Sequence, residues 1–189
     1  MIERIYALAE PYWHTRAGEL HMPASYAMAQ RLLEALPEAD AEIVLPAILL
    51  HDVGYARVPE ETHRDGLAGA PDGWDADVTR RHEREGARLA AEILAQVGFD
   101  AAKAARVVEI VDGHDSRAHA LSLEDAIVKD ADKLWRFTAS GVRAAHAWIG
   151  RTPEQFMDYV ATRVDDWFFT EPAKALARAA LAEARACAY

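Results

Sequence analysis

The stretch IVLPAILLHD, residues 43–52, decides the fold: eight uncharged residues run directly into a histidine and an aspartate. Periodicity alone does not distinguish a buried strand from a buried helix in so short an apolar run. Pro46 argues against a central strand, because proline cannot donate a ladder hydrogen bond. We therefore predict a buried helix over about 41–53, with Pro46 near its start or at a kink.

His51 and Asp52 close this helix and have two interpretations. In the first, they are simply the end of the helix reaching solvent. In the second, they are buried and need a partner, because aspartate is rarely buried unless it is paired or binds a metal ion. Gly54 follows them as a plausible helix stop.

The rest of the chain has mostly the apolar spacing of amphipathic helices. One long irregular segment, 55–74, follows His51 and Asp52 and contains two prolines and three glycines; loops of this length are often binding lids. The pattern predicts an all-α fold, a single-domain helical bundle over residues 1–189. The expected helices cover 1–9, 20–36, 41–53, 75–97, 100–112, 123–137, 139–149, 153–168 and 171–186.

Composition narrows the class of protein. A net charge of −10 disfavours binding to nucleic acid or to an anionic membrane. No apolar stretch approaches the roughly 18 residues of a membrane span. The single cysteine, Cys187, permits no intramolecular disulfide and argues against a thiolate metal site. The first residues lack the basic-then-apolar order of a secretion signal, so we expect a cytoplasmic protein.

Histidines and aspartates recur along the chain at intervals that fit one or two helices. In order they are His21, His51-Asp52, His82, His114-Asp115 and Asp132. Imidazole and carboxylate together are the ligand set of a divalent transition metal. If the helices pack side by side, these side chains can converge on one point in the bundle, which favours a metal-dependent enzyme.

The order His, His-Asp, His, His, Asp resembles the HD superfamily of metal-dependent phosphohydrolases. Residues 49–54 (LLHDVG) resemble its defining motif, and residues 130–134 (DADKL) resemble its closing motif. The match spans about 14–140, and the helices over about 139–187 contribute no motif. The resemblance implies an HD-type helical bundle and bound metal, with one or two ions of Mn, Fe, Ni, Co or Zn, or else Mg.

The resemblance also assigns ligands. One ion would be held by His21, His51, Asp52 and Asp132. Asp52 would bridge to a second ion held by His82 and His114; with a single ion, these two histidines would contact substrate instead. Asp130 competes with Asp132 for the closing role, but residues two apart on a helix point roughly 200° apart, so only one can face the metal. We choose Asp132.

Further candidates surround these ligands. The candidate catalytic residues are Asp52, Asp115, Glu83 and Lys133, and the candidate substrate-binding residues are Arg16, Lys133 and Arg136. Asp115 is interpreted as a hydrogen-bond acceptor for a metal-binding residue, as a general base, or as a turn residue. Glu83 would orient His82 or accept a proton. The three basic residues would meet a phosphate or lie at the surface.

These observations favour a phosphohydrolase acting through metal-activated water on a nucleotide or small phosphorylated metabolite. Two alternatives stay open: a di-iron oxygenase of the same superfamily, and a non-catalytic metal-binding helical module. The expected partner is a small phosphorylated substrate, without nucleic acid or membrane. The apolar residues 167–169 are interpreted as core, and a homodimer that uses them as its surface stays open as the alternative.

Overall fold

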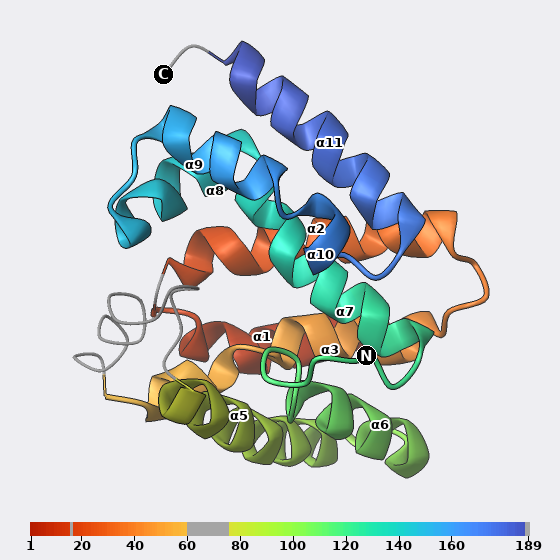
Figure 1. Ribbon diagram of the computed structural model, residues 1–189. Coiled ribbons are helices and arrows are strands. Elements are labelled where there is room, and N and C mark those ends of the chain that lie inside the picture. The colour runs from red at the N-terminus through yellow and green to blue at the C-terminus, as the bar shows by residue number, and fades with distance from the viewer. Residues whose placement is uncertain (16, 60–75, 188–189) are drawn as a thin grey trace.

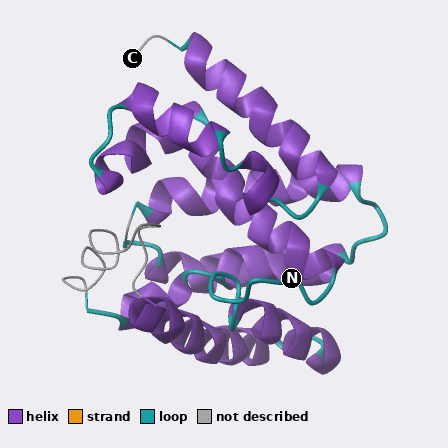
Figure 2. Ribbon diagram, viewed as in Figure 1, coloured by secondary structure: helices purple, strands orange, loops and turns teal. Residues whose placement is uncertain are grey.

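The computed structural model describes residues 1–15, 17–59 and 76–187. Within these ranges the chain forms helices and no strand (Figures 1 and 2). In the described part of the chain, the short 3₁₀ helices η1 to η4 cover Glu10–Tyr12, Val53–Arg57, Trp135–Phe137 and His146–Ile149. The α-helices are α1 (Ile2–Ala9), α2 (Gly18–Ala35), α3 (Ala41–Leu50), α5 (Ala76–Val97), α6 (Ala101–Val111), α7 (Leu123–Leu134), α8 (Ala139–Ala145), α9 (Pro153–Ala161), α10 (Val164–Trp167) and α11 (Glu171–Ala186). The predicted all-α class is confirmed.

The helix over 43–50 is the centre of the bundle. In α3 all these residues except Leu45 are buried, so the prediction of a buried helix is confirmed. Asp40 caps the helix by accepting a hydrogen bond from the Glu42 amide. Pro46 lies in the helix interior. The helix ends at Leu50, three residues earlier than predicted, and the chain tightens into η2 after Asp52.

The helices lie in layers around α3. Contacts join α3 to α1, α2, α6 and α7. Figure 1 shows α5 and α6 on one side of the bundle and α8 to α11 on the opposite side. In the second of these groups Phe168 is buried in the core, as interpreted from the sequence, whereas Phe169 is 42% exposed. In the described part of the chain, no helix is long and apolar enough to span a membrane.

Three helices predicted as continuous are interrupted, and one of them, 139–149, is divided after Ala145 into α8 and η4. The predicted helix 153–168 is divided at Thr162 and Arg163 into α9 and α10, and 123–137 ends as α7 at Leu134 before η3. Gly141 permits the tight turn from η3 into α8, because a Cβ there would lie 1.9 Å from the Trp135 carbonyl oxygen. Thr138 caps α8 at this turn by accepting a hydrogen bond from the Gly141 amide.

Two glycines allow the segment after α3 to touch α5. A Cβ at Gly54 would lie 1.9 Å from the His82 carbonyl oxygen and 2.4 Å from the Gly86 nitrogen. A Cβ at Gly86 would be 3.3 Å from the His51 carbonyl oxygen. Gly54 is therefore the point where the backbone after α3 crosses close to the backbone of α5, and it is not the helix stop expected from the sequence. This crossing brings His51 and Asp52 beside His82.

We expect Gly54→Ala to lower the free energy of unfolding by about 2–3 kcal/mol, because the added methyl group forces two backbones apart. Gly86→Ala is the matched control. Its Cβ needs only a few tenths of an ångström, and alanine gains up to about 1 kcal/mol of helix propensity over glycine. Urea unfolding followed by circular dichroism measures both. Equal effects of the two substitutions would contradict the close crossing.

Candidate metal centre

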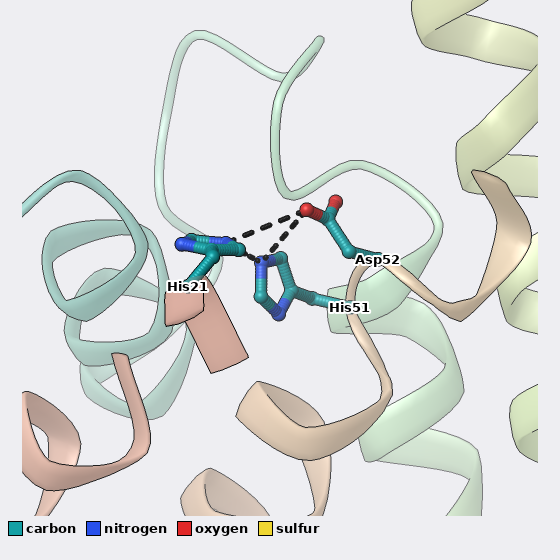
Figure 3. Close-up of side chains that lie close together, drawn as sticks. All are labelled: His21, His51 and Asp52. Carbon is teal, nitrogen blue, oxygen red and sulfur yellow. Dashed lines mark hydrogen bonds and ion pairs between the residues drawn. The ribbon is translucent and has the colours of Figure 1, made fainter. Parts of the chain in front are cut away.

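Three elements meet in what we call the first cluster: His21, His51, Asp52 and Asp132. His21 comes from α2, His51 and Asp52 follow α3, and Asp132 lies on α7. The Nε2 atoms of His21 and His51 are 3.0 Å apart, and Asp52 Oδ2 lies 3.4 and 3.5 Å from them (Figure 3). Asp132 Oδ1 lies 3.3 and 3.6 Å from the same nitrogens. The first cluster therefore offers two imidazoles and two carboxylates.

A second cluster forms on the other side of Asp52 and consists of Asp52, His82, His114 and Asp115. The Nε2 atoms of His82 (α5) and His114 are 3.4 Å apart. Asp52 Oδ1 lies 3.8 and 3.4 Å from these nitrogens. Asp115 Oδ2 lies 3.6 and 3.7 Å from them. The two oxygens of Asp52 thus face different clusters.

Outer hydrogen bonds orient the imidazoles. Nδ1 of His51 donates to the Ile48 carbonyl at 2.8 Å, and Nδ1 of His114 donates to the Val111 carbonyl at 2.9 Å. Because a carbonyl group only accepts hydrogen bonds, Nδ1 carries a proton in both rings. When such a ring is neutral, its Nε2 atom has a free lone pair, and this lone pair faces the cluster. Ser25 Oγ pairs with His21 Nδ1 at 3.1 Å.

His82 is supported differently from the other three histidines. Its Nδ1 is buried without a hydrogen-bond partner among the described residues. Its ring stacks instead on Tyr55, with centroids 4.0 Å apart and planes 12° from parallel. Stacking fixes the plane of the ring but not its tautomer.

The spacing of these atoms fits divalent cations. Two ligand atoms about 2.1 Å from one ion lie about 3.0 Å apart in octahedral and about 3.4 Å apart in tetrahedral coordination. The distances from each imidazole Nε2 to the other Nε2 and to the carboxylate oxygens are 3.0–3.6 Å in the first cluster and 3.4–3.8 Å in the second, close to these values. Two groups of residues that could hold an ion, His21–His51–Asp52 and Asp52–His82–His114, share Asp52.

The carboxylates favour positive charge at both clusters. Burial by itself would raise the pKa of Asp52, but the charge of His51 and hydrogen bonds from His114 and His21 hold it well below the usual range. Burial opposes a charge on His114, yet Asp115 and Asp52 raise the pKa of this imidazole to about 9. Burial and the neighbouring His114 charge lower the pKa of His82 to about 4. The clusters therefore stabilise positive charge, which a divalent ion would supply.

Asp130 and Asp132 point to different parts of the molecule, as their helical spacing predicts. Asp132 joins the first cluster. Asp130 accepts hydrogen bonds from the amides of Phe169 and Thr170, at 2.8 and 3.0 Å, and from the Thr170 hydroxyl at 2.7 Å. It therefore attaches the C-terminal helices to α7.

A small cleft opens over the first cluster. Trp135, Arg136 and Trp148 line it together with His21, Asp52, Asp115 and Asp132. Nη1 of Arg136 donates to the Asp132 carbonyl at 3.3 Å and lies 3.6 Å from Asp132 Oδ1. The candidate phosphate-binding residue Arg136 is thus a cation at the mouth of the site.

Other predicted site residues are not brought to the clusters. Glu83 is fully buried, and its carboxylate hydrogen-bonds Arg80 and the backbone of Asp115 and Ser116, so it neither orients His82 nor faces the cleft. Lys133 Nζ donates to the Lys129 carbonyl at 3.3 Å, and Lys133 is not among the residues that line the cleft. Arg16 and residues 60–75, which include most of the predicted lid, lie outside the described residues.

Sequence reasoning missed three residues that support the site: Ser25, Tyr55 and Lys129. Ser25 lies one turn after His21, and this i,i+4 spacing is a signal that could have found it. Tyr55 gave no such signal, because its stacking on His82 depends on the glycine crossing. Lys129 carried a weak signal, a lone cation in the apolar part of α7, and it is 1% exposed.

Together these features define an all-helical protein with a buried histidine–aspartate centre suited to divalent cations. The family model described as HD domain matches residues 20–136. The chain therefore belongs to the HD domain family, as the resemblance of its motifs implied. A search of curated proteins and a search of solved structures found no match.

Proposed function

We propose that this protein is a metal-dependent phosphohydrolase that cleaves an ester or anhydride bond in a nucleotide or a small phosphorylated metabolite. One observation carries the proposal. Two clusters, each with two imidazoles and two carboxylates, share the carboxylate of Asp52. Membership of the HD domain family supports it, because that family is typical of metal-dependent phosphohydrolases.

The chain's residues would hold divalent ions at both clusters. When bound, such ions supply a water of lowered pKa and positive charge for the phosphoryl oxygens. His51 and His114 keep their Nε2 lone pairs aimed at the clusters through their carbonyl-bound Nδ1 groups. Asp52 holds the two clusters at a fixed separation.

Arg136 and Asp115 would act on the substrate side of the centre. In a protein of net charge −10, a phosphorylated substrate needs local cations. Arg136 has five N–H donors in a planar fork, and its contacts to Asp132 use Nη1. Asp115 lines the cleft and also faces His82 and His114. It would serve as the second carboxylate of that cluster, where it could also accept a proton.

The test combines metal analysis with an activity screen. We expect protein purified without oxygen to contain one or two divalent ions per chain and to release phosphate from at least one member of a panel of nucleotides and phosphorylated metabolites. A chelator should abolish the release and added metal should restore it. His119→Ala, which changes an exposed histidine outside the site, should leave metal content and activity unchanged.

Other outcomes identify the alternatives. Oxygen consumption without phosphate release, in protein loaded with iron, would favour the di-iron oxygenase. Protein that binds metal but acts on no member of the panel would favour the non-catalytic module.

A further inference from the structure

The turn over residues 113–117, between α6 and α7, supplies half of the second cluster. It carries His114 and Asp115, and it lies outside any helix. His82, by contrast, is placed by α5, and Asp132 is placed by α7. Something other than helical backbone must therefore hold the turn in place.

Glu83 holds the turn from the side of α5. Its Oε1 accepts hydrogen bonds from the amides of Asp115 and Ser116, at 2.9 and 2.7 Å. Its Oε2 accepts the Ser116 hydroxyl at 2.7 Å. Arg80 also pairs with this carboxylate, so a cation lies beside the group that binds the N–H groups of the turn.

Lys129 holds the same turn from the side of α7. Its Nζ donates to the carbonyls of Gly113, His114 and Arg117, at 2.6, 2.8 and 3.1 Å. The three N–H donors of the ammonium group are thus matched by three backbone acceptors. Asp125 Oδ1 is 3.9 Å away. A buried ammonium group is costly, and all three of its hydrogen bonds go to the turn.

We infer that Glu83 and Lys129 are positioning residues that clamp the turn 113–117 between opposite charges and so place His114 and Asp115 in the second cluster. The inference rests on the proposed function. Each clamping residue lies on a helix that also carries a ligand. Glu83 directly follows His82 on α5, and Lys129 lies one turn before Asp132 on α7.

This arrangement fixes the turn relative to both helices. The negative group binds N–H groups and the positive group binds carbonyls, so both polar sides of the backbone are held. His114 and Asp115 then meet His82 and Asp52 before any ion arrives, and such preorganisation raises affinity for the ion. The clamp acts on the second cluster because the first cluster takes no residue from the turn.

The test is the number of Mn²⁺ ions bound by Glu83→Gln and Lys129→Met after equilibrium dialysis at several free Mn²⁺ concentrations. We expect wild-type protein to bind two ions. In both variants the affinity for the second ion should fall about 10–100-fold, the range found when a residue that orients a metal ligand by a hydrogen bond is lost. The first ion should be retained. Glu85→Gln, two residues along α5, and Lys174→Met on α11 change the same residue types outside both clusters and the turn, and these control variants should bind two ions.

The outcomes separate this inference from the proposed function. Folded clamp variants that bind both ions with wild-type affinity, even with a lower melting temperature, would show a merely structural role and overturn the inference. Wild-type protein that binds no Mn²⁺ or other divalent ion would overturn the proposed function as well. If Lys129→Met does not fold, the Glu83 side of the clamp still tests the inference: Ser116→Ala removes the hydroxyl that donates to Glu83, and unchanged affinity for the second ion in Ser116→Ala and Glu83→Gln would count against the clamp.

Discussion

Asp52→Ala is expected to remove both ions and with them all phosphate release. The two carboxylate oxygens of Asp52 face different clusters: Oδ2 lies 3.4 Å from His21 Nε2, and Oδ1 lies 3.4 Å from His114 Nε2. Losing a residue that only hydrogen-bonds to a metal ligand costs about 10–100-fold in metal affinity or activity. Losing the shared ligand should therefore reduce activity by more than about 100-fold, measured with metal content on the same sample.

Two further variants isolate the shared role of Asp52. His21→Ala should weaken only the ion of the first cluster, and His82→Ala only that of the second, because each imidazole belongs to one cluster. Metal titrations at a fixed pH count the ions retained. If Asp52→Ala kept one ion with wild-type affinity, the two clusters would not share this carboxylate, and the bridging arrangement would be wrong.

Helical periodicity predicted where helices begin better than where they end. Thr152 and Thr170 precede prolines in the sequence, and both cap helices by accepting a backbone hydrogen bond as their type predicts. The ends at Leu134 and Ala161 were missed because the apolar pattern continues past them. The turn after Leu134 depends on Gly141 lying against the Trp135 carbonyl, a contact that no local pattern reveals.

The order of histidines and aspartates predicted which helices carry the site. It could not predict whether an acidic residue next to one of these histidines faces the metal centre or binds the backbone. Glu83 and Asp115 both adjoin a histidine of the second cluster, and the sequence gives them equal standing. Only the packing of α5 against the turn 113–117 separates them: Asp115 faces the imidazoles, and Glu83 binds the backbone behind them. The division into two clusters likewise depends on the glycine crossing that places His82 beside Asp52.

Asp130→Ala is expected to lower the free energy of unfolding by about 3 kcal/mol or more while leaving metal binding intact. The substitution removes the acceptor of three hydrogen bonds, two of them buried, and each buried donor left without a partner costs about 1–3 kcal/mol. The donors belong to Phe169 and Thr170, at the start of α11, so the packing of α11 on α7 should loosen first. Urea unfolding gives the free energy, and hydrogen exchange of the α11 amides locates the loosening.

Asp132→Ala is the matched partner, two residues further along α7, and should behave in the opposite way. Asp132 Oδ1 faces His21 and His51 in the first cluster. Its loss should release the ion held there and abolish phosphate release, while the amides of α11 exchange at the wild-type rate. If Asp130→Ala instead lost metal and Asp132→Ala kept it, Asp130 would be the closing ligand. The helical geometry opposes that result, because neighbours two positions apart face opposite sides of α7.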